Sequence, residues 1–158
     1  MKYLIKNIAV VNEGKTFYSD VFINNQRIEK MASSINLPAN TAVKEINGEN
    51  LHLLPGCIDD QVHFREPGLT HKATIISESK AAAAGGITSF MDMPNTIPNT
   101  LTQELLEEKY AIASESSVVN YSFFMGINQD NLEEALLTDP ENVCGITDDG
   151  LYFNNDHG

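Results

Sequence analysis

The chain has 158 residues, with 10 lysines and arginines against 22 aspartates and glutamates, which leaves a formal net charge of -12. This acidic balance argues against a nucleic-acid-binding protein, which needs a basic patch to neutralise phosphates, and against docking on anionic lipid. No apolar run approaches the roughly 18 residues of a membrane span, and no small-residue cleavage site follows the mildly basic start. The sequence therefore predicts a soluble, cytoplasmic protein with room for one ordinary hydrophobic core.

Residues 1–54 alternate short apolar runs with turn residues. The runs YLIKNIAVV, DVFI and RIEKM are separated by NEGK and NNQ, and AVKEI and LHLLPG continue the pattern. Apolar runs punctuated by Asn and Gly are typical of β-hairpins. This part of the sequence predicts a small antiparallel sheet or half-sandwich, as a separate N-terminal β segment.

From residue 55 onward the rhythm changes to alternating strands and helices. Strands are predicted to begin near residues 57, 87, 118 and 143, and the runs between them, ATIISESKAAAA, LTQELLEEKYAIASES and NLEEALLTD, are typical of helices. The pair Gly85-Gly86 ends the first helix, and Thr100 or Thr102 can cap the second. Such alternation predicts an α/β fold with a parallel sheet, either a barrel or an open sheet.

Two cysteines, Cys57 and Cys144, both lie in apolar runs of this second region. A pair of isolated cysteines in a chain of this size does not resemble a disulfide scaffold. We expect both to be small buried residues.

Polar side chains follow the end of each predicted strand. In chain order they are Gln61, His63, Arg65 and Glu66; Asp92 and Asn95; Asn128; and Thr147, Asp148 and Asp149. Parallel α/β proteins build their active sites at the carboxyl ends of strands. The agreement among separate segments predicts an active site at this edge of the sheet.

Strand alternation would put Gln61, His63 and Arg65 on one face of the first strand. A His-x-His pair on one strand commonly holds a metal ion, and here the first position is Gln, a poor partner for zinc. Taken alone, His63 fits a buried, hydrogen-bonded histidine equally well, and Asp149 fits a plain Asp-Gly turn. Arg65 could pair with Glu66, or it could clamp a carboxylate of a small acidic substrate.

The stretches PGCIDDQVHFREPGLTHK, AAAAGGITSFMDMPNTIPNT and ITDDG together resemble dihydroorotases of the amidohydrolase superfamily. The resemblance covers the segment from Pro55 to about Gly150, and HFREPG with MPNT is specific within the superfamily. It implies a partial metal-dependent-hydrolase (βα) barrel of about four strands over residues 55–158, preceded by a β-sandwich-like segment over residues 1–54.

The resemblance also implies a reaction, the reversible zinc-dependent hydrolysis of the cyclic amide of dihydroorotate to carbamoyl aspartate in pyrimidine biosynthesis. Two zinc ions are expected in the complete site, where the metal activates water and polarises the ring carbonyl. By motif, His63 and Asp149 would be metal ligands, and Arg65 and Asn95 would bind the substrate carboxylate. Gln61 stands where the family usually has its first metal-binding His.

A complete βα barrel needs about 250 residues, and the resemblance implies that two further metal-binding histidines and the general acid/base Asp lie beyond residue 158. An open strand edge and an uncovered apolar face favour association, so we expect a homo-oligomer that binds a small-molecule substrate. Two alternatives stay open at this point. One is a catalytically inert dihydroorotase-like scaffold or subunit module, which Gln61 favours; the other, disfavoured by Arg65 and Asn95, is an allantoinase or hydantoinase.

Overall fold

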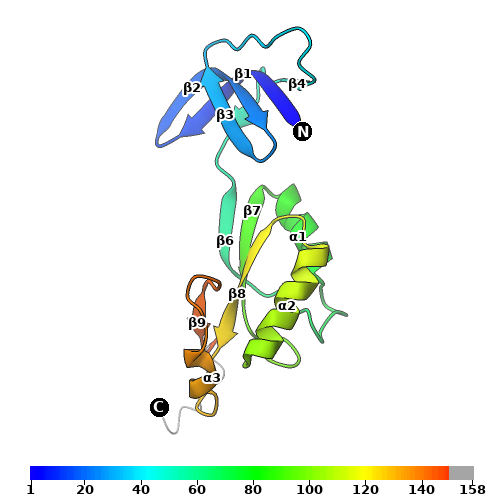
Figure 1. Cartoon of the computed structure of the whole chain (residues 1–158), viewed down its shortest axis with the longest axis vertical. Helices are drawn as coiled ribbons and strands as arrows, with labels where there is room; N and C mark the ends of the chain where they lie inside the picture. Colours follow the sequence, from blue (N-terminus) through cyan, green and yellow to red (C-terminus); the bar gives the residue numbers. More distant parts are fainter. Residues whose placement is uncertain (150–158) are drawn as a thin grey trace. The chain divides into compact units, whose positions relative to one another are not determined.

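The computed structural model describes residues 1–149, which form two compact units that divide between Pro55 and Gly56. Unit 1 denotes Met1–Pro55, and unit 2 denotes the chain from Gly56 onward. Figure 1 shows unit 1 as a strand-rich unit and unit 2 as alternating strands and helices. No helix in residues 1–149 combines the length and apolar character needed to cross a bilayer.

Unit 1 is a five-stranded sheet. Its strands are β1 (Lys2–Asn12), β2 (Lys15–Asn24), β3 (Arg27–Ala32), β4 (Lys44–Asn47) and β5 (His52–Leu53). The first three pair antiparallel in the order β3-β2-β1, and Glu13 and Gly14 turn the β1–β2 hairpin with positive φ. Buried apolar residues of this unit form two clusters, one around Ile5, Ile8, Val10 and Val21 and one around Leu4, Phe22 and Ile35.

Of the predicted small antiparallel sheet or half-sandwich, the antiparallel pairing is confirmed for β1, β2 and β3 and is wrong for the last two strands. Both β4 and β5 pair with β1 in parallel. The segment between Ala32 and Lys44 is long enough to bring the chain back in the original direction, which a tight hairpin turn cannot do.

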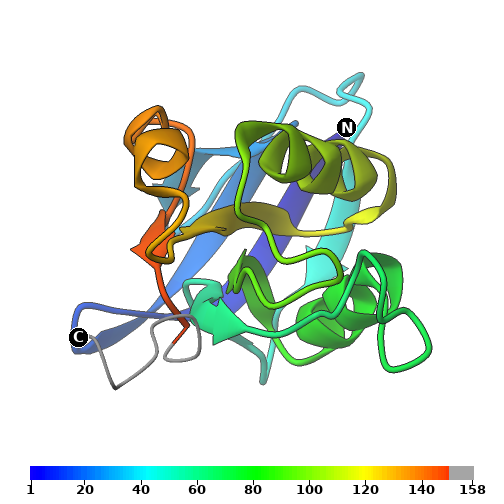
Figure 2. The ribbon, with the colours of Figure 1, turned by 90° about the horizontal axis from the view of Figure 1, so that it is seen from below.

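Unit 2 contains a four-stranded parallel sheet in the order β6-β7-β8-β9. The strands are β6 (Cys57–Val62), β7 (Ile87–Asp92), β8 (Asn120–Gly126) and β9 (Gly145–Thr147). The helices between them are α1 (Ile75–Ala84), α2 (Gln103–Ser116) and α3 (Leu132–Leu136). The sheet is curved, and α1 and α2 lie side by side along its outer side (Figure 2). This confirms the predicted α/β fold of a partial barrel with about four strands.

The helices begin at the threonine caps that their sequences offer. Thr74 caps α1 by accepting a hydrogen bond from Ser77 N, and Thr102 caps α2 by accepting one from Leu105 N. Apolar side chains of α1 and α2 pack against Phe90 and Phe123 of the sheet, where the core of unit 2 lies. The helices therefore brace the sheet from one side and leave the carboxyl ends of its strands to the loops.

Cys57 is exposed and Cys144 is half-buried, so the prediction that both cysteines are buried is wrong. Among the described residues β6 is an edge strand of its sheet, and its neighbour Ile58 is also exposed. An apolar run in the sequence does not show which side chains are buried, because that depends on what packs against each face of the strand.

Candidate active site

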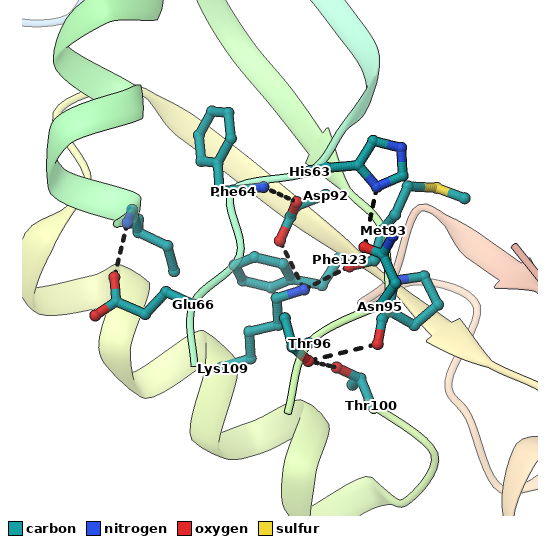
Figure 3. A network of polar contacts seen from close by, with 12 residues as sticks. His63, Phe64, Glu66, Asp92, Met93, Asn95, Thr96, Thr100, Lys109 and Phe123 are labelled. Atoms are coloured by element: carbon teal, nitrogen blue, oxygen red, sulfur yellow. Dashed lines mark hydrogen bonds and ion pairs between the residues drawn. The ribbon is translucent and has the colours of Figure 1, made fainter. Parts of the chain in front are cut away.

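The first and second predicted site segments meet at the carboxyl ends of β6 and β7. His63 follows β6 directly and Asn95 lies in the loop after β7. His63 Nδ1 lies 2.9 Å from Asn95 Oδ1, and the two atoms share a hydrogen bond (Figure 3). The His63 side chain is exposed, so its interpretation as a buried core histidine is wrong, while its hydrogen bond joins two side chains 32 positions apart.

Strand alternation does not extend through this segment as predicted. β6 ends at Val62, and its register against β7 shifts between Asp59 and Val62. Arg65 has a positive φ of 68° and Gly68 one of 80°, so the chain turns sharply after His63. Loop geometry, and not a strand face, therefore places Arg65.

Glu66 is engaged elsewhere and is not the partner of Arg65. Its Oε2 accepts a 2.7 Å hydrogen bond from the backbone N–H of Ile75, the first residue of α1, where a carboxylate is favoured by the helix dipole. Within the part of the chain that the structure describes, the Arg65 guanidinium makes no ion pair. Its charge is thus available to a bound anion.

Gln61 lines a pocket of about 240 Å³ together with Asp60, Met93, Phe124 and Thr147. These residues come from the carboxyl-terminal parts of β6, β8 and β9 and from the residue after β7. The pocket therefore opens where the four strands end, which is where a small substrate would enter a barrel of this type.

Asp149 follows β9 and has a positive φ of 53°. Its backbone N–H donates to Thr147 Oγ1 over 3.1 Å, which holds the turn. Its carboxylate atom Oδ2 is buried and has no hydrogen-bond partner in the described residues. A buried carboxylate oxygen without a partner is costly unless a cation or donor meets it.

Beneath these loops lies a fully buried ion pair. Asp92 Oδ2 at the end of β7 is 2.6 Å from Lys109 Nζ on α2, and their side chains are 1% and 0% exposed. Asp92 Oδ1 accepts a 2.8 Å hydrogen bond from Phe64 N, and Lys109 Nζ donates one of 2.8 Å to Met93 O (Figure 3). The ammonium also lies 4.8 Å from the centre of the Phe123 ring.

Sequence reasoning placed Asp92 at a strand end but missed Lys109. Burial lowers the pKa of Lys109, and the nearby carboxylates of Asp92 and Asp149 oppose that shift. The available signal was position: Lys109 lies on the same helix stripe as Leu106 and Ala113, both buried. A lysine within such a stripe needs a buried acidic partner.

The residues present fit part of a metal site. A Nδ1–H that donates to Asn95 leaves Nε2 of His63 with its lone pair, and Asp149 offers a buried, unpartnered carboxylate oxygen. Residues 1–149 contain no cluster of three or more His, Cys, Asp or Glu side chains that could hold a metal ion. His63 Nε2 and Asp149 Oδ2 have the donor chemistry that a metal ion needs, and their role as ligands stays a prediction.

Comparisons with known proteins agree with this architecture. The family described as Dihydro-orotase-like matches residues 51–157. The chain is 44% identical over 112 residues to a dihydroorotase of Wolbachia sp. subsp. Brugia malayi, which covers 70% of this chain and 25% of that protein. It is also 34% identical over 140 residues to an allantoinase of Deinococcus radiodurans, covering 88% and 30% of the two chains.

Among solved structures, an L-hydantoinase from Arthrobacter aurescens has a TM-score of 0.83 at 23% identity, covering 91% of this chain and 32% of that one. At this identity the likeness shows the fold alone. The chain spans about a quarter to a third of the length of the proteins that it matches. Because the family match covers most of the chain, including every candidate site residue, the chain belongs to the dihydro-orotase-like family of cyclic amidohydrolases.

Proposed function

We propose that the protein is a dihydroorotase, which hydrolyses the cyclic amide of dihydroorotate reversibly to carbamoyl aspartate in pyrimidine biosynthesis. The observation that carries this proposal is the 2.9 Å hydrogen bond between His63 and Asn95, which joins the HFREPG and MPNT stretches at one edge of the sheet. Arg65 belongs to the same loop, and its guanidinium makes no ion pair within residues 1–149. A cationic side chain beside an amide suits a substrate that carries a carboxylate.

In this proposal Arg65 and Asn95 bind and orient the substrate carboxylate. His63 and Asp149 belong to the ligand set for zinc, with two ions expected in the complete site, and Gln61 stands at the position of a usual ligand. When bound, the metal polarises the amide carbonyl and activates water at neutral pH. Gln61 lines the pocket at the strand ends, where its amide can donate to a substrate carbonyl or accept from a ring N–H.

We further propose that units 1 and 2 are separate domains, that the protein is cytoplasmic, and that it forms a homo-oligomer. The sheet order leaves β6 and β9 at its edges, and neither has a second strand partner within residues 1–149. Unpaired strand edges promote association unless further strands or another chain cover them. The unpaired edges of β6 and β9 therefore support the proposal that further strands or another chain cover them in the functional protein.

The experiment that tests the function compares turnover of dihydroorotate, allantoin and hydantoin by the purified protein, with zinc measured on the same sample. We expect turnover of dihydroorotate alone. Arg65→Ala should raise KM for dihydroorotate roughly 10- to 100-fold, the loss expected for charge-assisted hydrogen bonds, without loss of zinc. Arg27→Ala changes the other arginine of the chain, on β3 in unit 1, and is the matched control.

A second candidate is a catalytically inert module, which the glutamine at position 61 favours. It predicts no turnover of any of the three substrates and no stoichiometric zinc. Turnover of allantoin instead of dihydroorotate would mean that Arg65 and Asn95 do not select a carboxylate, and would move the assignment to the allantoinase class.

A further inference from the structure

The ion pair between Asp92 and Lys109 is not used by the proposed chemistry, and burial makes it expensive. Both side chains are almost completely dehydrated. Taking two charges out of water costs several kcal/mol per ion, and a pair of apolar side chains is often at least as stable. Stability alone therefore does not account for an ion pair at this place in the fold.

The contacts of the pair connect the two loops that carry His63 and Asn95. Asp92 Oδ1 accepts from the backbone N–H of Phe64, the residue that follows His63. Lys109 Nζ donates to the carbonyl of Met93, two residues before Asn95. Within residues 1–149, Lys109 is the only partner of Asp92 Oδ2. Lys109 on α2 thus ties the segment after β6 to the segment after β7.

The far side of the Asn95 loop is braced independently. Thr96 Oγ1 donates to Pro98 O over 2.8 Å and lies 3.3 Å from Thr100 Oγ1, and Thr100 N donates to Pro94 O over 3.0 Å. Thr96 and Thr100 are 2% and 1% exposed. These bonds fix the shape of the loop. Its position relative to His63 is set by two backbone hydrogen bonds, from Met93 N to Val62 O over 2.9 Å and from Ile97 N to Pro67 O over 3.2 Å, together with the contacts of the buried pair (Figure 3).

The position of that loop decides which nitrogen of His63 carries the proton. Because the side-chain oxygen of Asn95 can only accept a hydrogen bond, this contact requires a hydrogen on Nδ1, and in the neutral ring Nε2 then keeps its lone pair. A ring nitrogen binds a metal only through such a lone pair, and the hydrogen bond at the other nitrogen selects the tautomer.

We propose that Asp92 and Lys109 are positioning residues, which hold the loops after β6 and β7 so that Asn95 keeps His63 in its Nδ1–H tautomer. The pair touches neither substrate nor metal and acts through the backbone of Phe64 and Met93. That this tautomer prepares His63 to bind zinc rests on the proposed function. The tautomer itself can be observed in the metal-free chain.

The test is the ¹⁵N spectrum of the His63 imidazole in the metal-free chain, at about pH 8, above the ordinary pKa range of imidazole. The variants are Lys109→Met and the neutral double variant Asp92→Asn with Lys109→Met. The double variant keeps an oxygen acceptor for Phe64 N and leaves neither member of the pair as an unpaired buried charge, so it should fold even where the single variant does not. Lys6→Met, in the lysine–aspartate pair of unit 1, is the matched control.

We expect Nδ1–H to dominate in the unchanged chain and in Lys6→Met. In the neutral double variant the ratio of Nδ1–H to Nε2–H should fall roughly tenfold, the change expected for loss of one hydrogen bond. Asn95→Ala, in a half-buried loop position, should lower the ratio at least as much.

Two results would overturn the proposal. One is a dominant Nε2–H form in the unchanged chain, which would mean that Asn95 does not accept from Nδ1. The other is an unchanged ratio in a folded double variant, which would leave the pair a purely structural role. Neither result depends on turnover of dihydroorotate, so failure of this inference and failure of the proposed function are distinguishable.

Discussion

Within residues 1–149, each unit contains one lysine–aspartate ion pair, and the two pairs differ in their contact with water. In unit 1, Lys6 reaches Asp20 with 35% of its side chain exposed. In unit 2, Lys109 and Asp92 are both almost completely buried. Both aspartates accept hydrogen bonds from backbone N–H groups, of Asn7 and Ile35 in one case and of Phe64 in the other.

The difference shows two uses of the same pair of residue types. Asp20 ties β1 to the segment at Ile35 and the lysine remains hydrated, so unit 1 needs mainly the carboxylate. In unit 2 both charges are dehydrated, and each depends on the other. The more expensive arrangement is the one that lies beneath the candidate active site.

The largest expected effect on stability comes from replacing the lysine of each ion pair. Lys109→Met leaves Asp92 buried without a counter-charge and should lower the free energy of unfolding of unit 2 by about 3–5 kcal/mol. Lys6→Met should cost unit 1 only about 1 kcal/mol, because that pair is partly hydrated. Native-state hydrogen exchange can measure both, through the amides of Phe64 in unit 2 and Asn7 in unit 1. Equal losses in the two units would contradict the comparison.

A smaller loss of stability is expected when the glycine of one turn in each unit is replaced by alanine. Gly14 and Gly68 both have positive φ, but an added Cβ meets nothing within 4 Å at Gly14, while at Gly68 it would collide with the backbone of Ile97. Gly14→Ala should cost about 1–2 kcal/mol from φ alone. Gly68→Ala should cost roughly 2–4 kcal/mol, because overpacking is added to the same strain.

Thermal unfolding of the two glycine variants provides the measurement, with exchange of amides in each unit to locate the loss. Gly68→Ala should also reduce turnover, since it displaces the loop that follows Arg65. Equal destabilisation by the two substitutions would mean that the loop at Ile97 moves aside without cost.

The smallest effect is a pH dependence confined to unit 1. Burial by itself raises the pKa of Asp20, but hydrogen bonds from Lys6, Asn7 and Ile35 and the Lys6 charge outweigh burial and leave that pKa below its ordinary value. A carboxyl whose folded pKa is lowered stabilises the fold above its unfolded pKa of about 3.9, and this contribution is lost as the pH falls through the folded value.

We therefore expect amides of β1 and β2 to lose protection as the pH falls below about 4. Asp20→Asn should reduce protection at neutral pH and flatten its dependence on acid. If unit 1 of Asp20→Asn keeps the acid sensitivity of the unchanged chain, another carboxyl is responsible.

Much of the candidate site could be predicted because its residues are carried by local motifs. Arg65, Asn95 and Asp149 lie directly after strands whose apolar runs and flanking helices are clear in the sequence, and parallel strands bring their ends to one edge. The assignment of these residues to metal and substrate stays a prediction. The Lys109–Asp92 pair was missed, because a lysine on a helix is exposed unless tertiary packing buries it.

The sequence by itself determined the order of strands and helices, a threonine cap for α2, and the family, because these depend on periodicity, punctuation and motif within short windows. Tertiary structure decided the parallel pairing of β4 and β5, the exposure of Cys57, and the contact of His63 with Asn95. The physical reason is separation along the sequence. These features depend on residues that are far apart in the chain, and they arise only when tertiary packing brings those residues together or leaves them apart.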